Sequence, residues 1–135
     1  MIHLDTSFLV DLLREQASRK AGAAGAWLSA HADEALGASV FVSCELDAGA
    51  ARAAHPQRER GRVGELMKTL AIAFPDERFA AVYGGLLSTL QARGRTIATM
   101  DLLIATSAMV EGVALLTGNR RHFDLVPDLR VLSHR

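Results

Sequence analysis

The sequence is poor in several residue types, and each shortage narrows what the chain can be. Its 135 residues include one cysteine, Cys44, so no disulfide can form within the chain, which argues for a reducing compartment such as the cytoplasm. Aromatic residues make up only 5%. A core built mainly from Leu, Ala, Val and Ile favours helices packed on a small sheet over a sandwich of strands.

Long apolar runs are also missing. A membrane-spanning helix needs ~20 apolar residues, and the longest apolar stretch here is bounded by Asp101 and Glu111. At the start of the chain, Asp5 interrupts the sequence before the apolar segment of a secretory signal could build up. We therefore expect a cytoplasmic protein with neither a signal peptide nor a membrane partner.

There is no excess of charge of either sign, since 15 basic residues balance 15 acidic ones. Proteins that contact nucleic acid over a wide surface are usually more basic, so the composition argues against such a surface. Divalent cations held by some of the acids would shift this balance, because each adds two positive charges.

What is present is enough apolar material for a core, at 50% of the residues. The length suits one domain covering residues 1–135. Short apolar segments alternate with stretches of helical periodicity. Strands are predicted at residues 2–4, 36–39, 71–74, 113–117 and 130–132, and helices after residue 5 and at 21–32, 40–54, 63–70, 76–93 and 101–111.

Residues 52–64 fit either a loop or a helical hairpin, because Pro56 and Gly61 interrupt an otherwise helical composition. The alternation of short strands with helices predicts an α/β fold. We expect three layers, with a short parallel sheet flanked by helices on both faces.

Four oxygen-bearing side chains fall where the predicted strands end. Asp5 follows the first strand, Glu45 lies about a turn and a half into the helix after the second, Asp101 begins a helix, and Asn119 follows the strand at 113–117. In open parallel sheets, ligands bind beyond the carboxyl ends of the strands. Carboxylate and carbonyl oxygens are the ligands that Mg²⁺ and Mn²⁺ prefer, so the placement predicts a metal site.

Each of these residues also has a simpler structural explanation. Asp5 and Asp101 could serve only as helix caps, Glu45 could face solvent, and Asn119 could be a turn residue. The prediction rests on the four coinciding at one edge of the sheet. Cys44 is interpreted as a small buried apolar residue. The five histidines show no zinc-like spacing, and no serine has the context of a nucleophile elbow.

Four segments carry a recognisable pattern, in order and together covering most of the chain. They are LDTSFLVDLL at 4–13, SCELDAG at 43–49, GRTI at 94–97 followed by MDLLIA at 100–105, and LLTGNRRHF at 115–123, with a matching tail VPDLRV at 126–131. Together they resemble the motifs of PIN-domain ribonucleases, and more narrowly those of the VapC-type toxins of bacterial toxin–antitoxin pairs.

This resemblance implies an endoribonuclease that uses Mg²⁺, or Mn²⁺, to cut structured RNA such as transfer or ribosomal RNA. The family's first three acids fall on Asp5, Glu45 and Asp101, which would be catalytic as metal ligands. The fourth acidic position holds Asn119, a departure that leaves a second metal open because Asn offers only a neutral oxygen.

Other residues of this chain also acquire expected roles. Thr6 and Thr117 lie where the family often places supporting hydroxyls. Arg120 and Arg121 could bind RNA phosphates, as could the arginines within residues 58–62, for which a solvated loop is the alternative.

The resemblance further implies partners, namely a second copy of the chain and a cognate VapB-type antitoxin that covers the acidic groove. Trp27 and Leu28 could line that groove or pack in the core.

Two other functions stay open from the sequence. With its fourth acid missing, the chain could be a catalytically weak interaction module that keeps the fold and binds a partner. It could also be a nuclease of the same fold acting on DNA, because the metal chemistry of phosphodiester hydrolysis is the same for both nucleic acids.

Overall fold

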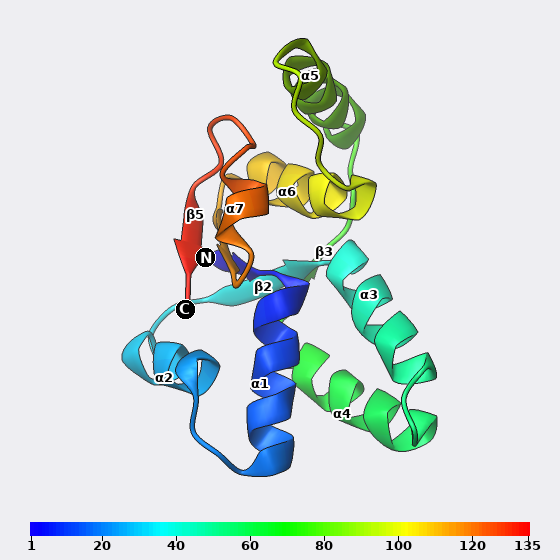
Figure 1. The fold of residues 1–135 in the computed structure, drawn as a ribbon, viewed down its shortest axis with the longest axis vertical. Helices are drawn as coiled ribbons and strands as arrows, with labels where there is room; N and C mark the ends of the chain where they lie inside the picture. Colours follow the sequence, from blue (N-terminus) through cyan, green and yellow to red (C-terminus); the bar gives the residue numbers. More distant parts are fainter.

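A five-stranded parallel sheet runs through the computed structural model, which describes residues 1–135, with helices on both of its faces (Figure 1). The strands lie in the order β3-β2-β1-β4-β5. The elements follow one another as β1 (Ile2–Leu4), α1 (Thr6–Ser18), α2 (Ala23–Ala30), β2 (Leu36–Ser39), α3 (Val40–Ala51), α4 (Pro56–Met67), β3 (Ala71–Ala73), α5 (Phe79–Ala92), α6 (Thr99–Glu111), β4 (Ala114–Thr117), α7 (Arg120–Phe123) and β5 (Val131–Ser133).

The direction in which the chain winds changes at the middle of the sheet. From β1 the chain moves outward through β2 to β3, and it then returns to the other side of β1 to form β4 and β5. Because such crossovers are right-handed, the two directions place their helices on opposite faces. Figure 1 shows α1, α2 and α4 on one side of the sheet and α6 and α7 on the other. The predicted three-layer α/β/α fold is therefore confirmed.

The central strands β1 and β4 are buried along their whole length, as expected for a parallel sheet covered on both faces. Helix α1 covers one face with apolar residues at helical spacing: Phe8, Leu9, Leu12 and Leu13. Helix α6 contributes Leu102, Ile104, Ala105 and Ala108 to the same continuous core. This packing holds fixed the carboxyl ends of β1 and β4, which lie side by side.

The structure differs from the sequence prediction, or completes it, at three places. Residues 52–64, left open between a loop and a hairpin, belong to a helical hairpin in which α3 packs on α4 and Pro56 occupies the first turn of α4. Asp76 does not begin α5, which starts at Phe79, because its carboxylate instead pairs with Arg78 at 2.6 Å. Cys44 is exposed on α3, so its interpretation as a buried apolar residue was wrong.

Helix α2 is held against α1 by specific contacts. The carboxylate of Glu15 accepts hydrogen bonds from the backbone N–H groups of Ala24 and Gly25, at 3.0 and 2.9 Å, and so satisfies free donors at the start of α2. Trp27 packs edge-on against Phe8 of the core, with ring centroids 5.9 Å apart, and stacks on His31. Trp27 is therefore partly buried against the core, and a role for it or for Leu28 in a partner groove stays a prediction. None of the helices is long and apolar enough to cross a membrane.

Candidate active site

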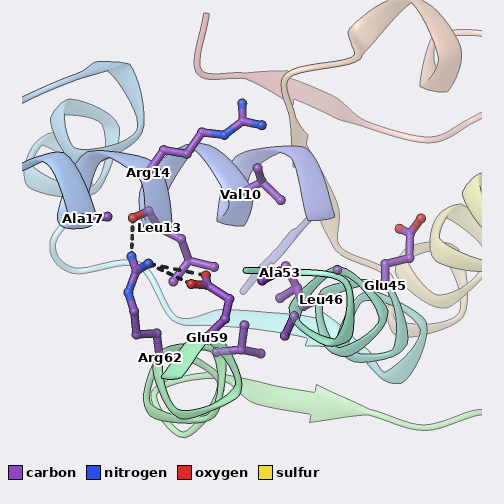
Figure 2. Close-up of a pocket in the computed structure, with 12 residues that line it drawn as sticks. Val10, Leu13, Arg14, Ala17, Glu45, Leu46, Ala53, Glu59 and Arg62 are labelled. Atoms are coloured by element: carbon purple, nitrogen blue, oxygen red, sulfur yellow. Dashed lines mark hydrogen bonds and ion pairs between the residues drawn. The ribbon is translucent and has the colours of Figure 1, made fainter. Parts of the chain in front are cut away.

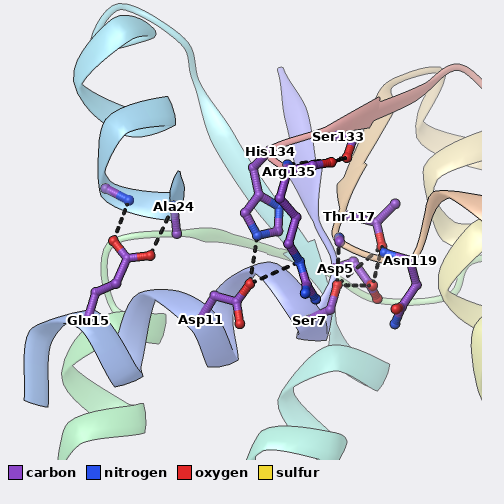
Figure 3. A network of polar contacts seen from close by, with 12 residues as sticks. Asp5, Ser7, Asp11, Glu15, Ala24, Thr117, Asn119, Ser133, His134 and Arg135 are labelled. Carbon is purple, nitrogen blue, oxygen red and sulfur yellow. Dashed lines mark hydrogen bonds and ion pairs between the residues drawn. The ribbon is translucent and has the colours of Figure 1, made fainter. Parts of the chain in front are cut away.

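Asp5 lies between β1 and β4, where the winding direction of the chain changes. Asp5 follows β1 directly and occupies the position before α1, but its side chain makes no capping hydrogen bond. Its Oδ2 instead accepts hydrogen bonds from Thr117 Oγ1 at 2.7 Å and from Ser7 Oγ at 2.8 Å (Figure 3). Because Asp5 is only 3% exposed, these hydroxyls replace the water that an ionised carboxylate needs. A role as a mere helix cap is thereby excluded for Asp5.

The two hydroxyls belong to a wider network that joins the start of α1 to the loop after β4. Ser7 Oγ and Thr117 Oγ1 are 3.2 Å apart. The backbone N–H of Gly118 donates to Ser7 Oγ at 2.8 Å, and that of Asn119 donates to Thr117 Oγ1 at 2.9 Å. Segments more than 100 residues apart in sequence are therefore locked around one oxygen of Asp5, and its other oxygen, Oδ1, accepts no hydrogen bond from the protein.

Glu45 approaches the same point from the second turn of α3. Its Oε1 accepts a hydrogen bond from Thr6 Oγ1 at 2.6 Å, and its Oε2 accepts none from the protein. Thr6 and Thr117 thus each donate a hydrogen bond to one acid, and their supporting role in catalysis stays a prediction.

Asp101 lies in the first turn of α6, and the residue before that helix is Ala98, so Asp101 is not the helix cap that the sequence suggested. The one basic side chain within ion-pair distance is His122, whose Nδ1 lies 3.6 Å from Asp101 Oδ2. Burial raises the pKa of the Asp101 carboxyl, and repulsion first from Asp5 and then from Glu45 raises it further, while His122 partly offsets the shift. The three acids therefore share one electrostatic environment.

One open cavity of about 300 Å³ brings the predicted site together. Its lining includes all four predicted residues and Thr6: the full set is Asp5, Thr6, Ser7, Val10, Asp11, Arg14, Glu45, Asp101, Asn119 and Arg135. Sequence reasoning missed Ser7, Asp11, Arg14 and Arg135. A pattern was available for the first three, because their spacing of four and three residues places them on one face of α1.

Comparison with known proteins identifies the family. The PIN domain family model matches residues 2–129, almost the whole chain. The chain belongs to the PIN-domain family.

Relatives place this PIN domain within the VapC branch. It is 32% identical to Ribonuclease VapC19 of Mycobacterium tuberculosis over 127 residues, which cover 94% of this chain and 95% of the relative. It is 31% identical over 92 residues to Ribonuclease VapC2 of Haemophilus influenzae, covering 68% and 70% of the two chains. The solved structure of VapBC-1 from nontypeable Haemophilus influenzae superposes with a TM-score of 0.79 at 25% identity, covering 99% of this chain and 98% of the other.

The acids of this PIN domain carry oxygen donors suited to a hard divalent cation, but they do not form a ready-made cage. No three His, Cys, Asp or Glu side chains stand close enough together to enclose a metal ion. Without a cation the acids repel one another, and this repulsion contributes to the raised pKa of Asp101. A cation would convert the repulsion that raises the pKa of Asp101 into attraction, so the donor set and its charge both fit such an ion.

A second cavity, of about 350 Å³, adjoins the acidic one between α1, α3 and α4 (Figure 2). It is lined mostly by apolar residues and shares Val10, Arg14 and Glu45 with the acidic cavity. At its far side, Arg62 donates to the backbone oxygen of Leu13 at 2.5 Å and pairs with Glu59 at 3.1 Å. Arg62 therefore ties α4 to α1 and is not part of a solvated loop.

The two arginines predicted to bind RNA lie on the short helix α7, and neither lines the acidic cavity. Arg120 pairs with Asp124 at 3.2 Å, and Arg121 is exposed. Their role in RNA binding stays a prediction.

Proposed function

We propose that this PIN domain is a divalent-metal-dependent endoribonuclease, with Mg²⁺ as its ion and Mn²⁺ as an acceptable substitute. The observation that carries the proposal is the meeting of Asp5, Glu45 and Asp101, from three different elements, in one cavity at the carboxyl edge of the sheet. Its relatives in Mycobacterium tuberculosis and Haemophilus influenzae, named as ribonucleases, support RNA as the substrate.

Asp5, Glu45 and Asp101 would hold the metal, and Asn119 could add a neutral oxygen. When bound there, a divalent cation supplies an acidified water for attack on phosphorus and stabilises the charge that develops on the phosphoryl oxygens. Hydrolysis of this kind requires no protein nucleophile.

The hydroxyl groups of Thr6, Ser7 and Thr117 orient two of these carboxylates. Thr117 and Ser7 engage only Oδ2 of Asp5, and Thr6 engages only Oε1 of Glu45, so each carboxylate is oriented while one of its oxygens stays free of hydrogen bonds. Such outer contacts fix ligand direction and are typically worth 10–100-fold in metal affinity or activity.

We further propose that the protein is the toxin of a VapBC-type pair, active in the cytoplasm on structured RNA such as transfer or ribosomal RNA. The VapBC-1 structure from Haemophilus influenzae, which it resembles at 25% identity, supports a cognate VapB-type antitoxin as its partner. A homodimer is part of the same proposal. The single, exposed Cys44 suits a reducing compartment.

The direct test compares Asp5→Asn and Asp101→Asn with Asp47→Asn, a matched change at an exposed position of α3 outside the cavity. We expect the first two to lose at least about a hundredfold in Mg²⁺-dependent cleavage of bulk transfer RNA, with circular dichroism unchanged. Asp47→Asn should retain wild-type activity. Undiminished cleavage in EDTA, or full activity of either cavity variant, would contradict the proposal.

The same assays address the two rival functions. Absence of any cleavage by wild-type protein, with Mg²⁺ binding retained in calorimetry, would favour the interaction module. Faster cleavage of single-stranded DNA than of RNA would favour the DNA nuclease.

Asn119→Ala should weaken metal binding, and an unchanged rate and metal dependence would remove Asn119 from the ligand set.

A further inference from the structure

Two arginines line the acidic cavity and keep most of their hydrogen-bonding capacity free. The side chain of Arg14, on α1, is exposed and makes no hydrogen bond or ion pair within the chain. Arg135, which follows β5, makes one side-chain ion pair, from its Nε to Oδ2 of Asp11 at 3.3 Å, and its side chain is 53% exposed. The two guanidinium groups therefore present free N–H donors beside a strongly negative cavity.

The position of Arg135 is set by its surroundings. Asp11 Oδ2 also accepts a hydrogen bond from Nε2 of His134 at 2.8 Å (Figure 3). The His134 side chain is fully buried and packs edge-on against Phe8. Asp11 is thereby fixed from the core side, and it holds Arg135 in turn.

Gly118 fixes the other side of Arg135. A Cβ atom at Gly118 would lie 2.6 Å from Nε and Nη2 of Arg135, so the guanidinium packs directly on this glycine. Gly118 stands between Thr117, which holds Asp5, and Asn119. The Arg135 head group consequently lies against the loop that forms one wall of the site.

Arg14 and Arg135 do not neutralise the three acids of the proposed metal site. Neither lies within ion-pair distance of Asp5, Glu45 or Asp101. Figure 2 shows the Arg14 side chain extending away from the Glu59–Arg62 pair, so it does not serve the second cavity's ion pair either. What the two share is a planar guanidinium with free N–H donors, which matches the geometry of a phosphate group.

Building on the proposed ribonuclease function, we propose that Arg14 and Arg135 bind RNA phosphates next to the phosphate that is cut. The carboxylates of the cavity repel a polyanion, so the substrate needs cationic contacts next to them to enter. Arg14 also lines the adjoining cavity between α1, α3 and α4. It therefore stands where an RNA strand leaving the acids would pass.

The experiment uses Arg14→Gln, Arg135→Gln and their combination, with Arg93→Gln as the matched control. Arg93 follows α5, is exposed, and lines none of the cavities described above. Binding of fluorescently labelled bulk transfer RNA is measured by anisotropy with each change placed in an Asp101→Asn background, which prevents cleavage. The same changes in the wild-type background give kcat and KM.

We expect each cavity variant to weaken RNA binding about tenfold, as for loss of one charge-assisted hydrogen-bonding group, and Arg93→Gln to leave it unchanged. KM should rise while kcat stays nearly constant. The slope of log Kd against log salt concentration should fall by about 0.7–0.9 for each phosphate contact removed, an effect that a purely structural role would not produce. Arg135→Lys should restore part of the affinity, because it keeps the charge without the fork.

Binding by Arg14→Gln and Arg135→Gln equal to that of Arg93→Gln, or an unchanged salt slope, would overturn the proposal. A fall in kcat at constant KM would also overturn it, because phosphates outside the reacting group are bound before the chemical step. Failure of the ribonuclease proposal looks different. In that case wild-type protein would not cleave RNA, while the arginine variants would still weaken binding in the Asp101→Asn background.

Discussion

Asp5 and Asp101 face the same cavity, but the protein holds them in opposite ways. Asp5 is buried and receives two hydroxyl donors on one oxygen, whereas Asp101 has only His122 within ion-pair distance, at 3.6 Å, and a raised pKa. The first acid is integrated into the hydrogen-bond network of the fold. The second is held at a cost to the fold, as is common for functional carboxylates.

Among the changes considered, Asp5→Ala should have the largest effect on stability. This change leaves the buried hydroxyl of Thr117 and the half-buried hydroxyl of Ser7 without their carboxylate acceptor, so the free energy of unfolding should fall by about 1–3 kcal/mol. Urea denaturation followed by circular dichroism measures it. Asp101→Ala is the control, and an equal loss for both variants would remove the distinction between the two acids.

A second prediction concerns His3, which is buried on β1 two residues before Asp5 and whose Nδ1 has no hydrogen-bond partner. Burial lowers the pKa of His3 below 6.5, against a partial opposing effect of Glu111. Because the folded state resists protonation, the stability linked to His3 is present above pH 6.5 and is lost as the pH falls, by at most ~1.4 kcal/mol per pH unit.

His3→Leu should remove this part of the acid sensitivity. Unfolding free energies of both proteins at pH 7 and pH 5 provide the measurement, and their difference isolates His3 from the other titrating groups. Parallel losses in the two proteins would show that His3 carries no such linkage.

Thr6→Val tests whether Glu45 resembles Asp5 in depending on a hydroxyl. Loss of the 2.6 Å hydrogen bond should lower RNA cleavage about tenfold and change the free energy of unfolding by less than about 1 kcal/mol. Thr6→Ser keeps the hydroxyl and should retain most of the activity. If valine and serine behave alike, the hydroxyl does not orient Glu45.

The smallest effect on stability has the opposite sign. The raised pKa of Asp101 means that its ionised form disfavours the fold, an effect absent below pH 3.8 and complete once the pH exceeds the raised value. Asp101→Asn should therefore increase the free energy of unfolding at pH 7 by about 0.5 kcal/mol, discounted for solvent screening, while abolishing cleavage. A gain that does not shrink towards pH 3 would point to another cause.

Much of this arrangement could be predicted from the sequence, because it depends on local patterns. The apolar segments at 2–4, 36–39 and 113–117 are short and bounded, and all three are strands of one parallel sheet. Since parallel strands present their carboxyl ends at one edge, the placement of Asp5 and Asn119 at that edge followed from their positions directly after predicted strands.

The contacts that set the properties of the site could not be predicted in this way. Thr117 donates a hydrogen bond to Asp5, which lies 112 positions earlier in the sequence. Arg135 lies at the cavity because its guanidinium pairs with Asp11 and packs on Gly118. Asp101 illustrates a second limit, because its sequence context fits a cap while the helix begins two residues earlier. Cys44 illustrates a third, since an apolar neighbourhood in sequence does not say which side of α3 meets solvent.

The separation of Asp5 and Thr117 in the sequence also determines when the site can form during synthesis of the chain. At about 5–20 residues per second, translation of the 112 residues that separate them takes roughly 6–22 s. Throughout that interval a nascent chain carries Asp5 and then Glu45 without the strand that completes their surroundings. The cavity forms only after β4 has been made and has docked beside β1, so a potentially harmful activity is acquired near the end of synthesis.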